Sequence, residues 1–284
     1  MVLEHDIPAG GRLYIGTQAK LKRQLEGDAA EFFEERGYRE IVTPYFSYHQ
    51  QGFIPLSKLI RVADRENRVV TLRGDTSFDL IRLVLKRLKS GHQKWFYIQP
   101  VFRYPSREIY QIGAEWLEGN LEELLTLNLE LFARWKVEGR LILSNQQITQ
   151  WLIGEGVLGE GELKRLELYK FPKWVRKLAK ISEISQLEKL EQFPAPLRAP
   201  LEELREIGEQ VARWGVEPLL ALVELPPFPY YRGIFFKFIA NQFLIARGGR
   251  YQVKEVESVG FSIYTDQLLE WIGEKGINSR KKVE

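Results

Sequence analysis

Hydrophobic positions along the chain repeat with two different periods, and each period predicts one kind of element. Between residues 17 and 36, apolar side chains recur every three or four positions, which predicts an amphipathic helix. The segment 39–44 is short and β-branched and ends at a proline, so we expect a strand at an edge or an end of a sheet. A second amphipathic helix is expected from Thr76 to about Leu88, with Leu88 on its buried face.

Alternating apolar and polar positions predict strands in both halves of the chain. Residues 95–103 and 109–117 are rich in aromatic side chains, and the short polar connection between them predicts an antiparallel hairpin at the centre of a sheet. Shorter segments of strand character stand at 58–63, 68–73, 218–225, 231–239, 243–247 and 256–264. A final helix is expected from about Thr265 to Ile272.

The middle of the chain has a different pattern. From about 121 to 214 the periods are helical and are interrupted by glycines and prolines, with one strand-like stretch at 139–143. Antiparallel strands on both sides of this region predict an α+β fold, in which helices flank an antiparallel or mixed sheet. We therefore expect a core formed by residues 1–120 and 215–284, with 121–214 as a mostly helical insertion.

The composition excludes several kinds of function. The net charge is only +3, from 41 basic and 38 acidic side chains, so no broad electrostatic field predicts a nucleic acid or a membrane as partner. The chain has no cysteine and three histidines far apart, so we expect no disulfide, no thiol catalysis, no metal and no cofactor. It also lacks a signal-peptide pattern and a long apolar run, which favours a cytoplasmic protein.

Four segments occur in an order that resembles a known family. They are FFEERGYREIVTPYF at 32–46, TLRGDTSFDLIRLV at 71–84, FYIQPVFRYPSREIYQIGAEWLEG at 96–119 and GGRYQVKEVESVGFSIYTDQLLEW at 248–271. In that order they are similar to motif 1, the substrate-binding loop, motif 2 and motif 3 of the histidyl-tRNA synthetase catalytic domain. The resemblance covers nearly the whole chain and implies a class II aminoacyl-tRNA synthetase-like antiparallel sheet flanked by helices.

The departures from that family bear on activity. Class II synthetases clamp the phosphates of ATP between an arginine of motif 2 and one of motif 3, because the transition state concentrates negative charge. Arg103 matches the first, but Gln267 stands where the family has the second, and Tyr264 where it has glycine. Pro226 and Pro229 replace the arginine and aspartate of the histidyl signature. We expect no catalytic residue and no synthetase activity.

Two further departures concern tRNA. The motif 2 loop is only seven residues long between Arg103 and Gln111, and the chain stops 14 residues after Glu270, which leaves no room for an anticodon-binding domain. The combination resembles the regulatory subunit of the short-form ATP phosphoribosyltransferase. That resemblance implies a short catalytic subunit as partner, self-association as a dimer within a hetero-octamer, and histidine as inhibitor of the first step of histidine biosynthesis.

A histidine ligand would need carboxylates, a cation and a neutral hydrogen-bonding group in one concavity. Gln111, Gly113 and Glu115 share one strand face, and Gln111 and Glu115 lie about 13 Å apart at roughly 3.3 Å per residue. By the resemblance both match ligand-contacting positions, with Gly113 letting the ligand approach the sheet. The alternative is a solvated outer face of the sheet.

The other candidate ligand residues have structural alternatives as well. Asp75 matches a carboxylate for the ligand's ammonium, but it or the next residue is also a candidate helix cap, with Asp79 completing a capping box. Arg103, with Arg107 behind it, would bind the ligand's carboxylate, or Arg103 pairs with Glu108 across the turn. Two aromatic residues complete the predicted site and otherwise belong to a buried aromatic strand: Tyr230 and Tyr231.

Other functions stay open at this point. A truncated synthetase paralogue could activate an amino acid for an acceptor other than tRNA, but Gln267 argues against it, since losing one preorganised charge donor costs about 10²–10³ in rate. A tRNA-shaped binding module, or a histidine sensor of another pathway, would need a basic acceptor-end surface. A dimeric scaffold without any ligand would bind no amino acid.

Overall fold

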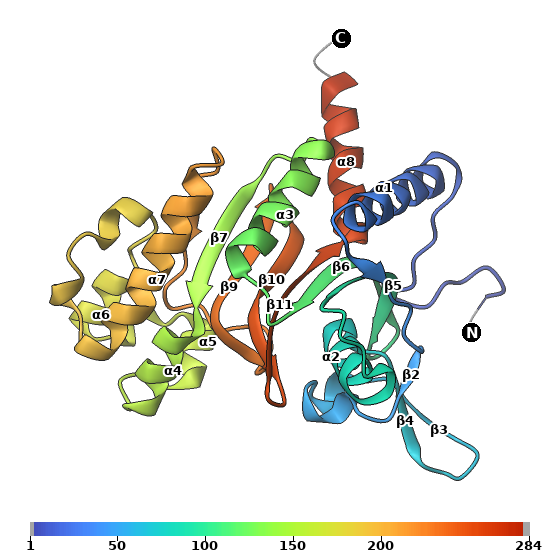
Figure 1. The fold of residues 1–284 in the computed structure, drawn as a ribbon, viewed down its shortest axis with the longest axis horizontal. Coiled ribbons are helices and arrows are strands. Elements are labelled where there is room, and N and C mark those ends of the chain that lie inside the picture. The colour runs from blue at the N-terminus through green and yellow to red at the C-terminus, as the bar shows by residue number, and fades with distance from the viewer. Residues whose placement is uncertain (1–2, 281–284) are drawn as a thin grey trace. The chain divides into compact units, whose positions relative to one another are not determined.

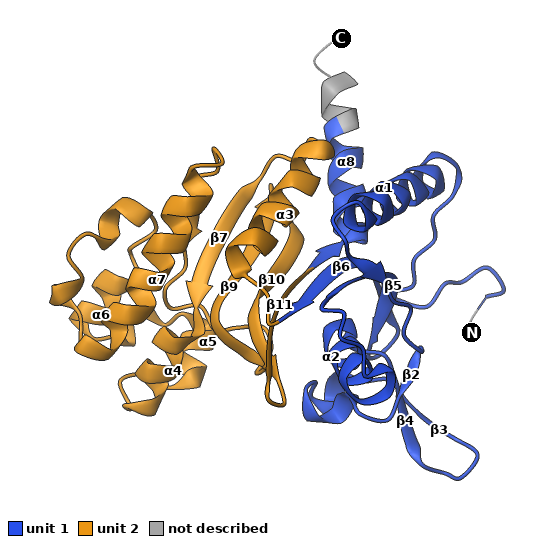
Figure 2. Ribbon diagram, in the orientation of Figure 1, with its two compact units in different colours: residues 1–117, 262–284 blue, residues 118–261 orange. Residues whose placement is uncertain are grey.

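The protein is described here by a computed structural model that covers residues 3–280, and its chain forms two compact units. Figure 2 colours unit 1, residues 1–117 and 262–284, apart from unit 2, residues 118–261. The strands after residue 230 therefore share a compact unit with the helices between 121 and 214. The division predicted from the sequence, with 121–214 alone as an insertion, stays a prediction.

Unit 1 combines a long hairpin with helices and a small second sheet (Figure 1). Its elements are α1 (Gly16–Glu34), β1 (Arg39–Glu40), β2 (Phe46–Ser47), β3 (Arg61–Ala63), β4 (Val69–Leu72), α2 (Thr76–Leu83), a π-helical turn η3 (Val84–Leu88), β5 (Lys94–Arg103), β6 (Arg107–Leu117), the end of β11 (Val256–Tyr264) and α8 (Thr265–Arg280). Short 3-10 turns η1 (Gln50–Gly52) and η2 (Leu56–Lys58) precede β3.

The hairpin of β5 and β6 is the centre of unit 1, as the sequence predicts. Its antiparallel register runs without a break from Lys94 opposite Trp116 to Arg103 opposite Arg107. The short strand β1 pairs in parallel with β5, and β2, β4 and β3 form the separate three-stranded sheet. One hairpin face packs on α1, where the rings of Phe33 and Phe96 lie 5.3 Å apart. The opposite face carries polar side chains and faces α2.

The end of the second helix differs from the sequence prediction. Leu80 and Val84 are fully buried as expected, but Leu88 is 50% exposed. Helix α2 ends at Leu83, and the next turn is a π-helix, which closes i→i+5 instead of i→i+4 hydrogen bonds. Leu88 consequently does not continue the line of Leu80 and Val84 into the core, and the prediction that it is buried is wrong.

Unit 2 joins a sheet to a group of short helices. Its elements are α3 (Leu121–Arg134), β7 (Arg140–Asn145), α4 (Gln146–Gly154), α5 (Glu160–Arg165), η4 (Leu168–Lys170), α6 (Lys173–Leu178), η5 (Ile184–Leu187), η6 (Leu190–Gln192), α7 (Ala195–Ala212), β8 (Leu219–Leu220), β9 (Tyr231–Ala240), β10 (Phe243–Val253) and most of β11. Asn120 and Asn145 cap α3 and α4 by accepting hydrogen bonds from the backbone amides of Glu123 and Gln147.

The sheet of unit 2 runs in the order β11, β10, β9, β7, β8. Strand β7 is the strand-like stretch that the sequence placed among helices, and it pairs antiparallel with β9 from Arg140 opposite Ile239 to Asn145 opposite Ile234. Helix α3 packs on this sheet, with the rings of Phe132 and Phe238 only 4.5 Å apart. The helical middle of the chain thus contributes its own strand to the sheet.

Residues 3–280 lack two features that would bear on function. No helix among these residues combines the length and the apolar character that crossing a bilayer requires. The same part of the chain holds no group of three or more histidine or carboxylate side chains placed to bind one metal ion.

Candidate ligand-binding site

The polar face of the β5–β6 hairpin brings together most of the predicted ligand residues of unit 1. The register places Gln111 opposite Gln99, Gly113 opposite Tyr97, and Glu115 two residues further on the same face. Glu115 is completely buried, whereas Gln111 is half-buried. The alternative of a solvated outer face is therefore wrong for Glu115.

Glu115 is held by the first turn of α2. The hydroxyl of Ser77 donates a hydrogen bond to its Oε1 carboxylate oxygen. Ser77 itself is half-buried, and it also forms a side-chain hydrogen bond with Tyr97. Ser77 is not among the ligand residues predicted from the sequence.

Tyr97 fills the space above Gly113. A Cβ atom at Gly113 would lie 2.2 Å from Cζ and 2.4 Å from the hydroxyl oxygen of Tyr97, so the glycine makes room for this ring. The expectation that Gly113 lets a ligand approach the sheet is wrong, because the ring of the facing strand already occupies the position. The period of two identified the correct face but not the side chain that covers it.

The Tyr97 hydroxyl belongs to the same polar group. It lies 2.6 Å from the Oγ of Ser262, at the end of β11. Burial raises the pKa of Tyr97 well above its ordinary value of 10, and the charge of Glu115 acts in the same direction. Tyr97 is therefore a neutral hydroxyl at physiological pH and contributes hydrogen bonds to the site without charge.

Asp75 caps α2, which confirms its structural alternative. Its Oδ1 accepts a hydrogen bond from the backbone amide of Phe78 at 2.9 Å. Gln50 fixes the same turn from outside, since its Oε1 accepts from the amide of Asp75 at 2.8 Å and its Nε2 donates to the Asp75 carbonyl at 2.9 Å. Asp79 does not complete a capping box; it accepts from Ser47 at 3.0 Å and from Gln50 at 2.7 Å.

Arg103 points toward the turn that carries Asp75. A Cβ on Gly74 would lie 2.7 Å from its Nη1, so this glycine makes room for the guanidinium. The register puts Glu108 opposite Phe102, on the other face of the hairpin, which argues against the predicted pairing of Arg103 with Glu108. Arg107 is exposed at the hairpin end. Arg103 and Asp75 are thus brought together, and Arg107 is not.

Arg73 is a fully buried arginine that the sequence analysis did not single out. Its guanidinium donates to the carbonyl of Thr43 at 2.6 Å, the hydroxyl of Thr43 at 3.0 Å, the carbonyl of Pro44 at 3.3 Å, and the carbonyl of Pro100 from both Nε at 3.1 Å and Nη2 at 2.5 Å. Burial lowers the pKa of Arg73 to about 10, so it stays charged at neutral pH. It ties the motif 1 segment to the hairpin.

Tyr230 and Tyr231 lie in unit 2 and are both buried. Their rings stack at 5.4 Å, and Tyr230 also stacks on Phe228 at 5.3 Å with an interplanar angle of 7°. Tyr251 meets Tyr230 edge-on at 5.6 Å. The alternative of an aromatic core is confirmed for these rings.

Gln267, which stands at the motif 3 arginine position by the resemblance, is hydrogen-bonded within its own helix. The Nε2 of Gln267 donates to Glu270 on the same helix at 3.3 Å. The neighbouring Asp266 is buried and accepts from the Tyr14 hydroxyl and from the backbone amide of Tyr110 at 3.2 Å. Burial raises the pKa of Asp266 above its ordinary value of 3.8. The start of α8 therefore presents a neutral amide at Gln267, and Arg12 pairs with Asp266 at 3.8 Å and with Glu270 at 2.8 Å.

Comparison with known proteins identifies the family. A family model described as histidyl-tRNA synthetase matches residues 14–170 and 167–268. The ATP phosphoribosyltransferase regulatory subunit of Wolinella succinogenes is 36% identical over 283 residues, which cover 96% of this chain and 97% of that protein. The regulatory subunit of Helicobacter hepaticus is 36% identical over 289 residues, 95% and 99% of the two chains. The chain belongs to the ATP phosphoribosyltransferase regulatory subunit family.

Solved structures confirm the predicted class II synthetase-like fold. A structure described as an ATP phosphoribosyltransferase regulatory subunit/histidyl-tRNA synthetase from Bacillus halodurans C matches with a TM-score of 0.81, covering 95% of this chain and 84% of that one at 19% identity. A histidine–tRNA ligase subunit from Alicyclobacillus acidocaldarius matches with a TM-score of 0.74, covering 97% and 99% at 20% identity. At these identities the likeness concerns the fold alone.

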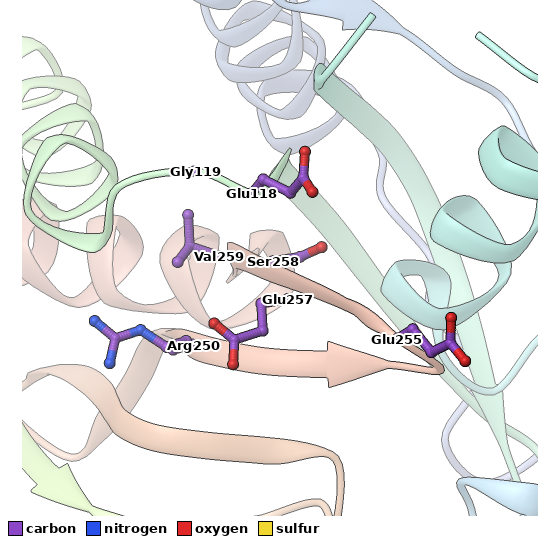
Figure 3. A pocket seen from close by; sticks show the side chains of 7 residues that line it. All are labelled: Glu118, Gly119, Arg250, Glu255, Glu257, Ser258 and Val259. Carbon is purple, nitrogen blue, oxygen red and sulfur yellow. The ribbon is translucent and has the colours of Figure 1, made fainter. Parts of the chain in front are cut away.

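Unit 2 of this chain also carries a pocket that the sequence did not predict. It measures about 320 Å³ and is lined by Glu118, Gly119, Arg250, Glu255, Glu257, Ser258 and Val259 (Figure 3). Arg250 is engaged with Glu203 at 2.5 Å. The pocket is rich in exposed carboxylates, and no motif in the sequence points to it.

Proposed function

We propose that this chain is the non-catalytic regulatory subunit of a short-form ATP phosphoribosyltransferase. In this role it is needed for activity of the catalytic subunit and for feedback inhibition by histidine at the first step of histidine biosynthesis, in the cytoplasm. The observation that carries the proposal is the match along nearly the whole chain to two relatives named as this regulatory subunit.

The proposal includes the absence of synthetase chemistry. Adenylate formation needs cations on both sides of the phosphates, because negative charge develops on the transferred group. Arg103 is available on the motif 2 side, but the motif 3 side offers Gln267, whose amide is hydrogen-bonded to Glu270. A neutral amide cannot replace the charge of a guanidinium there, which supports a regulatory and not an enzymatic role.

The same proposal assigns histidine to the polar face of the hairpin. Glu115 and Asp75 are carboxylates for the cationic groups of the ligand, Gln111 is a neutral partner, and Arg103 is a cation for its carboxylate. Arg107 is the outer member of the proposed set, since it is exposed. Tyr230 and Tyr231 pack in the aromatic group of unit 2, and their part in ligand binding stays a prediction from the sequence. Glu115 and Arg103 have the strongest geometric support.

Self-association is the second part of the proposal. The segment that resembles motif 1 exposes large apolar side chains: Val42 is 71% exposed, Tyr45 53% and Phe46 57%. Val62 of the small sheet lies on the same face as Phe46 and adds to this apolar surface, at 42% exposure. Apolar surface of this extent is typical of an interface between subunits. We propose that it forms a dimer contact within a hetero-octamer with the catalytic subunit.

The test uses the purified chain and the short catalytic subunit from the same organism. Formation of phosphoribosyl-ATP is measured for each protein alone and for the mixture, with and without histidine. We expect activity to require both chains and to fall with histidine. In a Glu115→Gln variant, which keeps the shape but removes the charge, we expect inhibition to weaken while the mixture stays active; Arg65→Gln, on the exposed β3–β4 turn, is the control.

A failure of the two proteins to interact would contradict the proposal. If the two proteins neither form a complex nor stimulate each other, the regulatory role is wrong. Amino-acid-dependent exchange between ATP and pyrophosphate by this chain alone would then support the truncated synthetase paralogue.

A further inference from the structure

Helix α6 and the segments next to it concentrate positive charge in unit 2 (Figure 1). Between residues 163 and 182 the sequence has seven basic side chains and one acidic side chain, a net charge of +6, whereas the whole chain has only +3. The three basic side chains that precede α6 form ion pairs with Glu160 or Glu167. The other four stand in and after α6.

These four basic side chains share one face of the helix and have no partner. They follow each other at the spacing i, i+3, i+4 and i+7, which places them on one side of a helix: Lys173, Arg176 and Lys177 in α6, and Lys180 in the turn after it. All four are exposed, and none forms a side-chain hydrogen bond or an ion pair with another described residue. We refer to these four residues as the basic stripe.

Helix stability alone does not account for the basic stripe. The opposite face of α6 is anchored, because Val175 and Leu178 are fully buried, so the four charges are held on a fixed element. Like charges three or four positions apart destabilise a helix. The helix dipole favours Arg176 and Lys177 in the last turn but disfavours Lys173 at the first residue, and the first turn has no acidic side chain. A partner of opposite charge would remove this repulsion.

The surroundings of the basic stripe favour a different protein chain as that partner. A contact with two-fold symmetry brings the same surface of two copies together, so a dimer centred on the stripe would oppose like charges. Three exposed apolar side chains directly precede α6: Leu166 at 56%, Leu168 at 44% and Tyr169 at 75% exposure. Protein interfaces combine apolar contacts with a polar rim, whereas the phosphate backbone of a nucleic acid has nothing apolar to cover aliphatic side chains.

We infer that the basic stripe, with the apolar side chains that precede it, is a docking surface for an acidic surface of the catalytic subunit. The inference rests on the proposed function, because it takes the catalytic subunit as the chain that carries the matching Asp and Glu side chains. Complementary charges raise the rate of association by steering the encounter, and salt screens them. Association through the stripe is therefore fast at low ionic strength and slows as salt is added.

The test changes two charges in the middle of the basic stripe. In Arg176→Glu/Lys177→Glu, the association rate constant with the short catalytic subunit at low salt should fall about tenfold or more. Arg176→Gln/Lys177→Gln removes the same charges without adding repulsion and should lie between this variant and the wild type. Glutamine also avoids a negative charge in the last turn of α6, so this second variant tests the inference even if the first does not fold.

The control reverses two charges elsewhere in unit 2. Arg140, the first residue of β7, and Arg213, at the C-cap of α7, are exposed and have no side-chain partner among the described residues. Arg140→Glu/Arg213→Glu changes the net charge by the same amount as the stripe reversal. Its association rate should stay within about twofold of the wild type, because exposed charges away from a contact are screened by salt.

Biolayer interferometry with the immobilised catalytic subunit measures the association rates, at about one third and about twice physiological ionic strength. Formation of phosphoribosyl-ATP gives a second readout. The concentration of this chain needed for half-maximal activity should rise in the stripe variants, whereas the activity at saturation should not change. This split separates docking from the transmission of a signal after docking.

Slower association of both stripe variants, with a smaller effect of salt than in the wild type and the control at the wild-type rate, supports the docking surface. Stripe variants that associate like the control, while the wild type binds the catalytic subunit, overturn the docking surface and leave the regulatory role intact. If the wild type does not bind the catalytic subunit at either ionic strength, both are wrong. Binding of a duplex RNA that only the stripe variants lose, with the catalytic subunit bound as before, assigns the stripe to a nucleic acid and overturns the inference.

Discussion

Replacing Arg73 with methionine tests how much a buried arginine stabilises unit 1. Methionine has a similar length but no donor, so the carbonyls of Thr43 and Pro100 and the hydroxyl of Thr43 lose bonds of 2.5–3.1 Å. A buried acceptor that loses its donor costs about 1–3 kcal/mol, and two such carbonyls give roughly 3 kcal/mol. This is a large fraction of a total stability of about 5–15 kcal/mol.

The measurement is equilibrium unfolding in urea, at one fixed protein concentration because self-association adds to stability. With a slope of about 1–3 kcal/mol per molar urea, a loss of roughly 3 kcal/mol lowers the midpoint by about 1 M or more. Arg68→Met is the matched control. Arg68 stands five residues before Arg73 in the sequence, its side chain is 61% exposed, and it pairs with Asp64 and Glu66. Exposed pairs contribute about 0–1 kcal/mol, so its midpoint should shift little.

Equal midpoints for the two methionine variants would refute this reasoning. They would mean that the cost of burying the Arg73 charge offsets its hydrogen bonds, so that the guanidinium gives position and not stability. A lower midpoint for Arg73→Met with an unchanged slope would instead assign the loss to the folded state.

Three further changes test other parts of the structure. Gly113→Ala should lower the free energy of unfolding by about 1–3 kcal/mol, because its Cβ would lie 2.2 Å from the Tyr97 ring. Gly27→Ala is the control: it lies in α1, its Cβ would have no atom within 4 Å, and it should stabilise the protein by about 0.5–1 kcal/mol. Urea unfolding measures both. Burial raises the pKa of Asp266, so the unfolded chain releases this proton at a lower pH than the folded protein, and the contribution of Asp266 to stability is lost as the pH rises through that window. The free energy of unfolding of Asp266→Asn relative to wild type should therefore increase from pH 4 to pH 7. A difference that does not change with pH would contradict this. Val42→Asp places a charge on the exposed apolar surface, and sedimentation should show monomers where the wild type sediments as a dimer; a monomeric wild type would remove the basis of the proposal.

The hydrophobic pattern predicted the main elements because each has a periodic buried face. The helix at α1 and the β5–β6 hairpin lie where the periods of 3.6 and 2 placed them. The end of α2 was missed, since a π-helical turn has the same composition as the α-helix that it follows. The pairing of β7 with β9 was also beyond reach, because a period of two says which face is buried but not which distant strand lies beside it.

The candidate site shows the same limit at the level of single residues. The shared face of Gln111 and Glu115 follows from alternation within one strand and was predicted correctly. Tyr97 and Ser77 were missed because they cover this face from other elements, and only the register and the position of α2 bring them there. Counted from the predicted connection at 104–108, the hairpin register would have placed Tyr97 opposite Glu115, on the correct face but two residues away from its actual partner Gly113.

The division of the chain into two compact units also affects how the protein folds during synthesis. Unit 2 is continuous in sequence, so all of its contacts are available once residue 261 has left the ribosome. Unit 1 is interrupted, and the partner of the Tyr97 hydroxyl, Ser262, follows 165 residues later. The polar group around Glu115 must therefore wait for the last part of the chain. A chain that ends at residue 261 and is released from the ribosome should hold a protease-resistant unit 2 and a unit 1 that is still open to cleavage.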